Sequence, residues 1–443
     1  MKVGFISLGC PKNLVDTEVM MGQLVAQGHE VTPRAEDADV IVVNTCSFID
    51  PAKQESVDTI LEMAEFKKSG KAKRLVVTGC LVERYGADIR KSIADVDAVV
   101  GTNQLVQIGA AVTGALAPAA PANEPYLYHD LTPRLRATPK HYAYLKIAEG
   151  CDHPCAFCVI PQFRGRFRSR QPESVVAEAT RMFQEGVEEI NLIGQDTTCY
   201  GEDLGMSDGL AQLLDRLARI ETPRPKWIRF LYSYPNKVTT RLLETMARHR
   251  ALVPYIDIPL QHASAGVLKR MKRGGSADVF LKLIGKIRRT VPEVAIRTSM
   301  IVGYPGETDA EFDELCRFVE EARFDHLGAF SYSDEETSAS FHLPNKIDRR
   351  TIYNRKRHLM ALQRKISRKS RRAMVGQEYE VLVECPSPDT NLLWQARLAT
   401  QAPEIDGLCY VNDFEGAAPA PGRRRRFRAT AAYDYDLVGT LLP

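Results

Sequence analysis

Three cysteines crowd into eight residues of this 443-residue chain, in the segment Cys151-Asp-His-Pro-Cys155-Ala-Phe-Cys158. The apolar run 142–147 precedes them, so the loop that carries them is predicted to follow a strand. Thiolates bind iron well, and this spacing lets one loop offer three sulfurs to three corners of a [4Fe-4S] cube. The fourth iron then has no protein ligand, which is typical of a cluster that binds a substrate.

Two other interpretations of this loop are open from the residues alone. The first is a structural zinc site with His153 as the fourth ligand, although zinc sites commonly pair two Cys-x-x-Cys segments and no second one follows Cys158. The second is an electron-transfer cluster, which needs a fourth cysteine near the other three. The sequence has none there.

A second set of cysteines, Cys10, Cys46 and Cys80, is spread over the first part of the chain at intervals of 36 and 34 residues. Each follows an apolar run predicted to be a strand, at 3–8, 40–43 and 75–77. The carboxyl ends of parallel strands meet at one edge of an open sheet, so the three thiols are predicted to converge on a second cluster. The alternative is three buried cysteines that act as small apolar residues.

The apolar pattern predicts a mixed α/β chain with several domains. Residues 1–115 are predicted to be an open α/β domain, 116–140 an Ala/Pro-rich linker, and 351–374 a basic helical connector. In 141–350, strand candidates alternate with helices, which predicts a partial (β/α)6 barrel; these candidates are 142–147, 188–194, 227–232, 255–260, 294–302 and 326–332. Residues 375–443 are predicted to form a small antiparallel β-barrel with strands near 378–383, 394–399, 407–411 and 426–431.

Charge and hydropathy exclude several classes. With 59 Lys+Arg and 56 Asp+Glu, the chain has a formal net charge of +3 and no overall polyanion-binding signature. Nine bases and no acid lie between Tyr353 and Met374, so any surface that faces nucleic acid or the ribosome is expected there. No run approaches the roughly 18 apolar residues of a membrane span, so we expect a cytoplasmic protein with no membrane partner.

With both cysteine sets in one chain, the sequence resembles the radical S-adenosylmethionine methylthiotransferases over essentially its whole length. Four segments resemble the branch that modifies a ribosomal protein: 7–13 (Ser-Leu-Gly-Cys-Pro-Lys-Asn), 195–197 (Gln-Asp-Thr), 259–264 (Pro-Leu-Gln-His-Ala-Ser) and 330–335 (Phe-Ser-Tyr-Ser-Asp-Glu). The tRNA-modifying branch typically has Gln after the first cysteine and Asn at position 196, where this chain has Pro11 and Asp196. The resemblance implies a central radical S-adenosylmethionine barrel of TIM-like form and a C-terminal TRAM domain.

The resemblance also implies the reaction and its cofactors. Two [4Fe-4S] clusters are implied, one at each cysteine set, with S-adenosyl-L-methionine used both to methylate sulfur and to generate the radical. The implied substrate is the small-subunit ribosomal protein number twelve, free or in the ribosome, modified at the β-carbon of one aspartate. Further implied partners are an electron donor such as flavodoxin or ferredoxin, and a sulfur donor.

Six further residues are candidates for contacts with S-adenosylmethionine. Phe157 precedes the third cysteine, where the family places an aromatic residue beside adenine; core packing is the alternative. Gln195, Asp196, Gln261 and Gly303 lie at the ends of predicted barrel strands, and Arg297 lies inside the fifth strand. For each of these the alternative is a structural hydrogen bond. No catalytic residue beyond the cluster ligands is predicted, and Cys199, Cys316, Cys385 and Cys409 are expected to be structural.

Two rival functions are left by the sequence. One is a tRNA adenosine methylthiotransferase, which the basic connector and the run 423–426 favour; the other is an iron-sulfur electron-transfer or ribosome-binding protein. The residues 375–443 hold ten acids against six arginines, which predicts that this domain docks a basic protein rather than RNA; the acids are Glu378, Glu380, Glu384, Asp389, Glu404, Asp406, Asp413, Glu415, Asp434 and Asp436.

Overall fold

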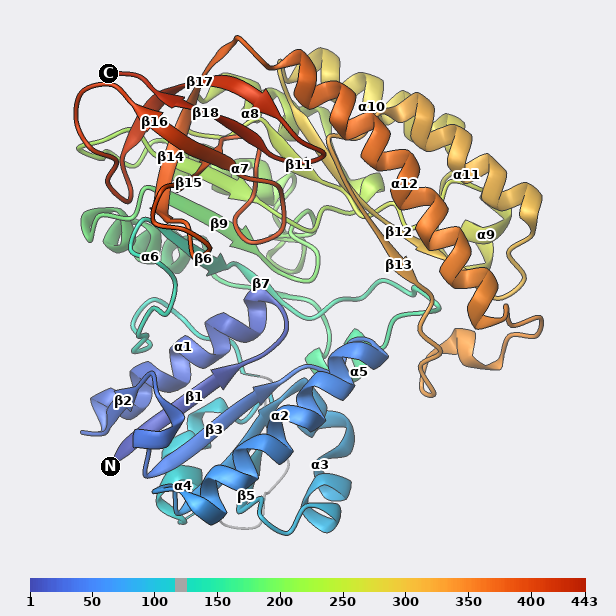
Figure 1. Cartoon of the computed structure of the whole chain (residues 1–443). Helices are drawn as coiled ribbons and strands as arrows, with labels where there is room; N and C mark the ends of the chain where they lie inside the picture. Colours follow the sequence, from blue (N-terminus) through green and yellow to red (C-terminus); the bar gives the residue numbers. More distant parts are fainter. Residues whose placement is uncertain (116–125) are drawn as a thin grey trace.

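The computed structural model describes residues 1–115 and 126–443. An N-terminal α/β domain lies at the bottom of Figure 1, an open barrel with its helices above and to the right of it, and a small β-barrel near the C-terminus. The predicted linker 116–140 falls partly outside the described residues, at 116–125. The predicted fold class, mixed α/β with a small C-terminal barrel, is confirmed.

The N-terminal domain is an open parallel sheet. Its strands and helices are β1 (Lys2–Ser7), α1 (Pro11–Ala26), β2 (Glu30–Thr32), β3 (Val40–Thr45), α2 (Asp50–Ser69), β4 (Arg74–Gly79), α3 (Cys80–Ser92), β5 (Ala98–Val100) and α4 (Ile108–Thr113). The strand order is β2-β1-β3-β4-β5. Every residue of β3 is buried, as expected of a central strand covered on both faces. Consequently β1, β3 and β4 end side by side.

The central domain is built from six parallel strands in two hydrogen-bonded groups, β6-β9-β10 and β11-β12-β13. The strands are β6 (Tyr142–Lys146), β9 (Glu189–Ile193), β10 (Trp227–Phe230), β11 (Tyr255–Asp257), β12 (Ala295–Val302) and β13 (His326–Ser331), and the two-residue strands β7 (Ala148–Glu149) and β8 (Arg168–Ser169) pair beside them. The helices are α5 (Ile160–Arg164), α6 (Pro172–Gln184), α7 (Gly209–Ala218), α8 (Thr240–Arg248), α9 (Ala265–Arg270), α10 (Ala277–Thr290) and α11 (Asp309–Ala322). A parallel bridge between Ile228 and Leu252 joins the two groups into one curved sheet.

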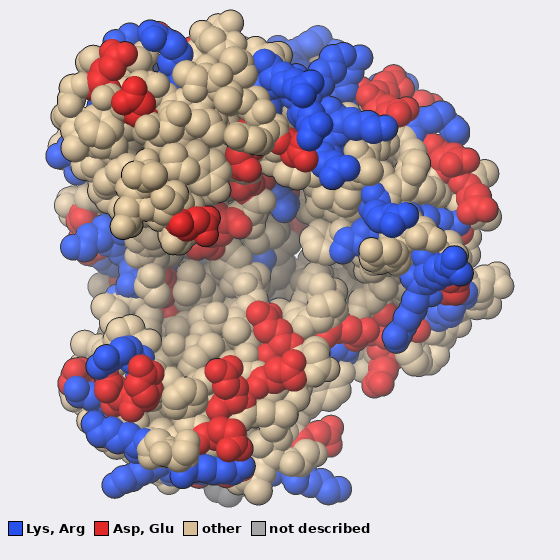
Figure 2. All heavy atoms as spheres, viewed as in Figure 1, with Lys and Arg blue, Asp and Glu red and all other residues tan. Residues whose placement is uncertain are grey.

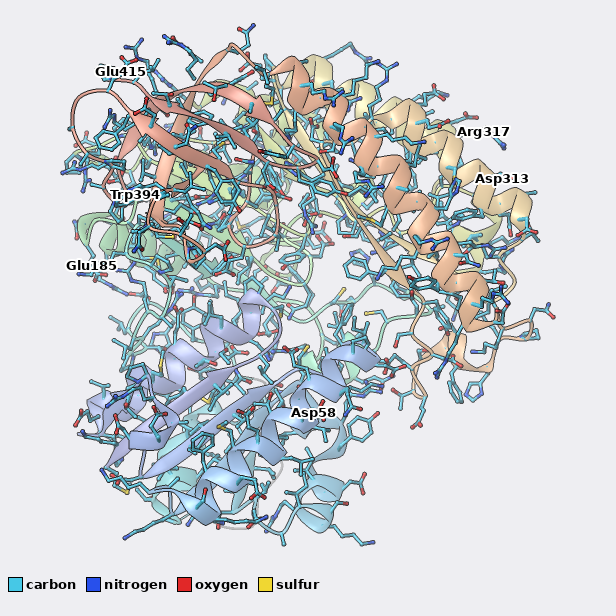
Figure 3. The ribbon with its side chains drawn as sticks, viewed as in Figure 1. Asp58, Glu185, Asp313, Arg317, Trp394 and Glu415 are labelled. Atoms are coloured by element: carbon cyan, nitrogen blue, oxygen red, sulfur yellow. The ribbon has the colours of Figure 1, made fainter. Side chains whose placement is uncertain are left out.

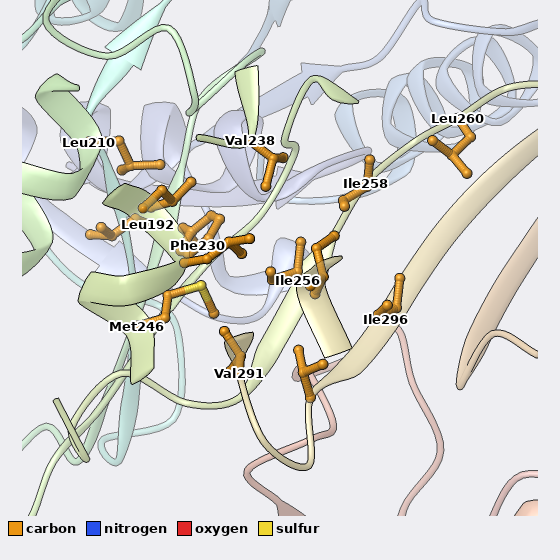
Figure 4. Packing of buried hydrophobic residues seen from close by; sticks show 14 of the residues in the cluster. Leu192, Leu210, Phe230, Val238, Met246, Ile256, Ile258, Leu260, Val291 and Ile296 are labelled. Atoms are coloured by element: carbon orange, nitrogen blue, oxygen red, sulfur yellow. The ribbon is translucent and has the colours of Figure 1, made fainter. Parts of the chain in front are cut away.

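The core of the central domain lies between this sheet and its outer helices. Figure 4 shows side chains from strands and helices meeting there, among them Leu192 of β9, Phe230 of β10, Ile256 of β11 and Met246 of α8. Burial of such apolar side chains is the main favourable term in folding. It leaves the carboxyl ends of the strands free to carry polar loops.

The chain ends in a long basic helix and a closed five-stranded barrel. These elements are α12 (Arg349–Ala373), β14 (Glu378–Pro386), β15 (Trp394–Leu398), β16 (Cys409–Phe414), β17 (Arg424–Ala432) and β18 (Leu437–Leu441). Four of the five neighbouring strand pairs in this barrel are antiparallel, whereas β16 and β18 run parallel. The sequence analysis missed β18, because five residues at the end of a chain give a weak alternating pattern. Blue side chains follow α12 in Figure 2.

A buried arginine network joins the C-terminal barrel to the central domain. Arg397 of β15 is fully buried and contacts Glu189 of β9 at 2.6 Å and Glu384 of β14 at 2.6 Å. Arg229 of β10 also forms an ion pair with Glu189, at 3.1 Å. Both Arg229 and Arg397 donate hydrogen bonds to the carbonyl oxygen of Gln401. Burial alone would raise the pKa of Glu189, but the two arginines hold it below its ordinary value.

We expect Arg397→Leu to lower the free energy of unfolding by about 3–5 kcal/mol, because one buried carboxylate oxygen of Glu189 loses its arginine and Glu384 keeps, among the described residues, only His141, at 3.5 Å. The matched control is Arg428→Leu, which removes a half-exposed ion pair with Glu378 and is expected to cost at most about 1 kcal/mol. Urea denaturation of the two variants measures the difference. Equal losses would show that the buried network does not hold the C-terminal barrel in place.

Candidate active site

The three N-terminal cysteines lie where the sequence analysis predicted, at the ends of adjacent strands. Cys10 is the N-cap of α1 after β1, Cys46 follows β3 directly, and Cys80 is the first residue of α3 after β4. The register pairs Ser7 with Asn44 and Thr45 with Gly79, so the three strand ends are level. The thiols therefore gather at one edge of the sheet.

Close packing and one asparagine hold these three loops together. Gly9 has φ +87°, and a Cβ there would lie 2.7 Å from Cys46 Cβ and 3.0 Å from its sulfur, so the Cys10 loop passes directly over Cys46. Asn13 donates to the carbonyl oxygens of Leu8 and Thr45, and Cys80 Sγ lies 3.6 Å from its Oδ1. Asn13 thus contacts the segments of all three cysteines.

The central cysteine loop follows β6 and β7 and precedes α5, again at the carboxyl end of the barrel. The N–H of Cys151 donates to the carbonyl oxygen of Gly165 at 3.2 Å, and the N–H of Ala156 donates to that of Met271 at 2.9 Å. Arg273 donates to Cys155 Sγ at 3.4 Å. All three cysteines are half-buried, on a loop whose backbone these hydrogen bonds hold in place.

His153 turns away from these thiols and toward a second polar cluster. Its ring stacks on Tyr234 at 3.8 Å, and its Nε2 lies 2.6 Å from Asp196 Oδ2. Cys199 Sγ lies 3.1 Å from the same carboxylate oxygen. Within the described residues, these three side chains form the one set of three ligand atoms within 4.8 Å of one another. The loop cysteines do not form a compact zinc site with His153.

The sequence predicts a structural role for Cys199, and the structure places its thiol 3.1 Å from Asp196 and 3.8 Å from His153. The signal that could have revealed this is the position of Cys199, three residues after Asp196 in the loop that follows β9. Burial alone would raise the pKa of Asp196, but hydrogen bonds from His153, Thr198 and Cys199 hold it below its usual value. Asp196 is therefore an ionised acceptor next to the central cysteine loop.

The two cysteine sets lie on the same side of the barrel. Cys80 packs in one apolar cluster with Val159, which follows Cys158 directly, and with Phe163. Lys12, two residues after Cys10, lies 3.4 Å from the ring centroid of Tyr232, which follows β10. Figure 1 shows the carboxyl end of the N-terminal sheet turned toward the central domain. This arrangement agrees with the prediction that two sites share one working face.

A buried carboxylate fastens the N-terminal domain to the end of the barrel. Glu335 follows β13 and is 2% exposed; it binds Arg84 of α3 at 2.8 Å and Lys53 of α2 at 3.0 Å. The sequence analysis singled out the segment 330–335 but could not find this role, because the partners lie more than 250 residues away. Ion pairs of that span leave no local pattern.

The predicted S-adenosylmethionine contacts have different surroundings. Asp196 and Gln195 border the cysteine loop: Gln195 donates to Glu149, and its own Oε1 is buried with no hydrogen-bond partner among the described residues. Phe157 packs against Met271 and Tyr304, as expected if this aromatic side chain serves core packing. Gln261 has φ +72° and pairs through its backbone with β12, so its conformation is fixed.

The structure gives Gly303 and Arg297 clear structural partners. A Cβ at Gly303 would lie 2.3 Å from Ile352 of α12, so close packing of that helix demands glycine. Arg297 contacts Asp257 at 3.1 Å and lies 3.5 Å from Asp406 of the C-terminal barrel. Its guanidinium therefore joins β11 to Asp406, a residue of the C-terminal barrel that contacts the sheet of the central domain.

The donor set at each cysteine site fits an iron-sulfur cube with an open iron. Each site offers three thiols on separate backbone positions, and Cys199, which borders the central loop, already contacts Asp196 and His153. Burial raises the pKa of Cys80 to about 12 and that of Cys158 to about 12. Metal binding at these thiols must therefore displace protons. Beside the central site, the buried Oε1 of Gln195 has no hydrogen-bond partner among the described residues, so it is available to accept a hydrogen bond from a bound group.

We expect His262, buried after β11, to make stability depend on pH. Its Nδ1 accepts from the N–H of Ser264, and burial lowers its pKa to about 3. The unfolded chain takes up this proton near pH 6.5, so the stabilisation is complete above that pH and falls as the pH drops toward 3. Between pH 7.5 and pH 5, wild type should lose about 2 kcal/mol more than His262→Gln, measured by urea denaturation of metal-free protein.

The control for this prediction is the exposed His342, where the same change to Gln should leave the pH dependence of wild type intact. Identical losses in wild type and His262→Gln would contradict the prediction.

Three family descriptions match this chain and together cover most of it. Residues 2–101 match "Uncharacterized protein family UPF0004", residues 145–319 the "Radical SAM superfamily", and residues 375–442 the "TRAM domain". The second match spans the central cysteine loop and the first five strands of the barrel. The fold and the cysteine loop therefore define a radical S-adenosylmethionine enzyme.

The sequence relatives identify the family within that class. A protein of Solibacter usitatus (strain Ellin6076) is 70% identical over all of this chain and 95% of its own length, and one of Koribacter versatilis (strain Ellin345) is 54% identical over all of this chain and 96% of its own. A third, from Myxococcus xanthus (strain DK1622), is 47% identical over 99% and 91%. All three are named "Ribosomal protein uS12 methylthiotransferase RimO". The chain belongs to the RimO family, the branch that its motifs predicted.

Solved structures support the fold at much lower identity. The radical S-adenosylmethionine methyltransferase TsrM from Kitasatospora setae, with cobalamin and a [4Fe-4S] cluster bound, aligns at TM-score 0.54 and 13% identity over 74% of each chain. The cobalamin-dependent radical enzyme OxsB aligns at TM-score 0.51 and 13% identity over 81% of this chain and 56% of its own. These likenesses concern the fold alone. Within the described residues, no helix has the length and apolar composition of a membrane span.

Proposed function

We propose that this chain transfers a methylthio group to ribosomal protein uS12, at the β-carbon of one aspartate. The observation that carries the proposal is the meeting of two three-cysteine sites on one working face of a radical S-adenosylmethionine barrel. The names of the full-length relatives supply the substrate. A chain that only carried electrons would need a complete four-ligand cluster.

We propose two clusters with separate ligand sets. Cys151, Cys155 and Cys158 hold the cluster that supplies the electron for cleavage of S-adenosylmethionine. Cys10, Cys46 and Cys80 hold the other, at which sulfur is carried. The residues of the chain orient both: Arg273 donates to Cys155, and Asn13 contacts the three N-terminal segments. Enclosure between two domains also limits side reactions of a radical.

The cofactor contacts are proposed at the carboxyl end of the barrel. Asp196, as an ionised and buried acceptor, fits the amino group of S-adenosylmethionine, and the unpartnered Oε1 of Gln195 fits a second donor. Phe157 offers an aromatic surface beside the loop, and Gln261 and Gly303 border the same edge. Arg297 keeps its place as a predicted contact, although Asp257 and Asp406 already bind it.

The acids of the C-terminal barrel divide into two groups, those that contact the central domain and those that stay exposed. Glu404 accepts hydrogen bonds from Tyr142 and Tyr144 and Asp406 from Tyr255, so these acids seat the barrel on the central domain. Glu415, on an outer loop in Figure 3, stays exposed. The predicted docking of a basic protein by residues 375–443 therefore rests on the acids that stay exposed, Glu378, Glu380, Asp389, Asp413 and Glu415.

Another acidic surface lies on the N-terminal domain. Four exposed acids recur at helical spacing along α2: Glu55, Asp58, Glu62 and Glu65. Figure 2 shows acids gathered on this domain below the hollow that separates it from the rest of the molecule. Such a surface attracts a basic protein, as ribosomal proteins generally are, whereas the basic α12 suits phosphate. The electron donor and the sulfur donor are proposed as partners on the family resemblance.

The test is an anaerobic assay with reconstituted full-length protein, S-adenosylmethionine, a sulfide source and a reductant. We expect purified uS12 to gain one methylthio group at an aspartate and tRNA to gain none, by mass spectrometry. Methylthiolation of tRNA without modification of uS12 would transfer the assignment to the tRNA-modifying branch. Absence of S-adenosylmethionine cleavage in protein with full iron content would exclude radical chemistry altogether.

A further inference from the structure

Arg164 occupies a position that links the two cysteine sites. It is the last residue of α5, six residues after Cys158, and its side chain points into the N-terminal domain. Glu149, two residues before Cys151, contacts it from the other end of the loop at 3.3 Å. The central cysteine loop is thus bracketed by two residues of one network.

The contacts of Arg164 reach across the domain boundary. One terminal nitrogen donates to Asp16 Oδ2 of α1 at 2.7 Å. The other donates to Asn13 Oδ1 at 2.5 Å and to Cys80 Sγ at 3.2 Å. Asn13 is the residue that contacts the segments of all three N-terminal cysteines. Arg164 therefore contacts one proposed cluster ligand directly, and through Asn13 it reaches the backbone just before the other two, at Leu8 and Thr45.

The network is buried and closely balanced in charge. Arg164 and Lys146 face Asp16 and Glu149, and each of the four side chains is 4% or 5% exposed. Two cations thus match two carboxylates before any thiol loses its proton. When metal binds, Cys80 loses its proton and its sulfur becomes more negative. The buried N–H of Arg164 already points at that sulfur. Hydrogen bonds to cluster sulfurs and nearby positive charge both raise a cluster's reduction potential.

We propose that Arg164 is a positioning residue of the N-terminal cluster: its guanidinium holds Cys80 in place from the central domain and raises the reduction potential of that cluster. This inference rests on the proposed assignment of Cys10, Cys46 and Cys80 as cluster ligands. It goes beyond that assignment because Arg164 belongs to the helix after the other cysteine loop. The same contact fixes the N-terminal site relative to the radical site.

A plain structural role for Arg164 would give a different outcome, and the chain offers a matched control. Arg134 is also a buried arginine at the boundary between the two domains. It binds Glu18 of α1 at 2.5 Å and Glu178 of α6 at 2.7 Å, and its recorded contacts include no cysteine. Loosening of the domain boundary alone should affect Arg134→Met and Arg164→Met alike.

The experiment uses the full chain with Cys151, Cys155 and Cys158 changed to Ala, so that the N-terminal cluster alone is observed. Arg164→Met, Arg164→Lys and Arg134→Met are introduced into this background and reconstituted with iron and sulfide. Potentiometric titration followed by electron paramagnetic resonance measures the potential. Arg164→Met should shift it to a more negative value, and Arg134→Met should leave it unchanged.

The two remaining variants keep the result interpretable. Arg164→Lys retains the charge but not the planar fork, so its shift should be smaller than that of Arg164→Met. Arg164→Met combined with Asp16→Asn also removes the carboxylate that would be left unpaired. Its shift should stay negative but be smaller than that of Arg164→Met, because the hydrogen bond to Cys80 is lost while one negative charge is removed with the positive one. Loss of iron from the Arg164 variants, with full iron in Arg134→Met, would also support the positioning role.

A wild-type potential and full iron content in both Arg164→Met variants would overturn the inference. Failure of the background protein itself to bind iron would instead overturn the two-cluster proposal, and the inference with it. The two failures are therefore told apart by the iron content of the background protein.

Discussion

Changing Cys151, Cys155 and Cys158 together to Ala is expected to leave about half of the iron, roughly four irons and four sulfides, and to abolish cleavage of S-adenosylmethionine. The three thiols lie on one loop at the carboxyl end of the barrel, and the neighbouring Cys199 contacts Asp196. Iron and sulfide analysis, together with detection of 5′-deoxyadenosine after reduction, measures both effects.

A control variant separates this result from a general effect of losing thiols. Cys385 is exposed in the C-terminal barrel, and Cys385→Ala should keep full iron content and full cleavage activity. Retention of cleavage in the triple variant would show that the loop does not hold the radical cluster.

Changing Cys10, Cys46 and Cys80 together to Ala should have the complementary effect. This variant should lose the other half of its iron and still cleave S-adenosylmethionine, because the barrel and its loop stay intact. Transfer of a methylthio group should fall below detection, since sulfur has no site from which to be transferred. Full wild-type iron content in this variant would contradict the assignment of the N-terminal site.

These two results together would also exclude a chain with a single cluster. A protein with one shared cluster would lose iron and cleavage activity in both triple variants. Separable losses require two sites. Each triple variant should retain its helix content, because five of the six cysteines lie in loops or cap a helix and Cys80 is only the first residue of α3.

Much of the fold was predictable because it depends on local patterns. Apolar runs at regular intervals revealed the barrel strands, and the position of Cys10, Cys46 and Cys80 after such runs predicted their convergence. The parallel sheet then brings residues 70 positions apart to one edge. The general rule for strand ends in parallel sheets was sufficient for both cysteine sites.

The contacts between domains were not predictable in the same way. Arg164, Glu335 and Arg397 each bind a partner in another domain more than 70 residues away in sequence, and a single charged residue leaves no periodic signal. The acid count of residues 375–443 could not separate solvated from buried carboxylates, for a related reason. Net charge does not say which carboxylates face solvent and which, like Asp406, are buried against another domain.

The most direct test of the central claim is mass spectrometry of ribosomal peptides from a strain that lacks this gene. The account predicts that one aspartate-containing peptide of uS12 loses the mass of a methylthio group, and that the intact gene restores it. Neither cysteine triple variant should restore it. An unchanged uS12 peptide in the deletion strain, together with the loss of a methylthio group from tRNA, would contradict the account.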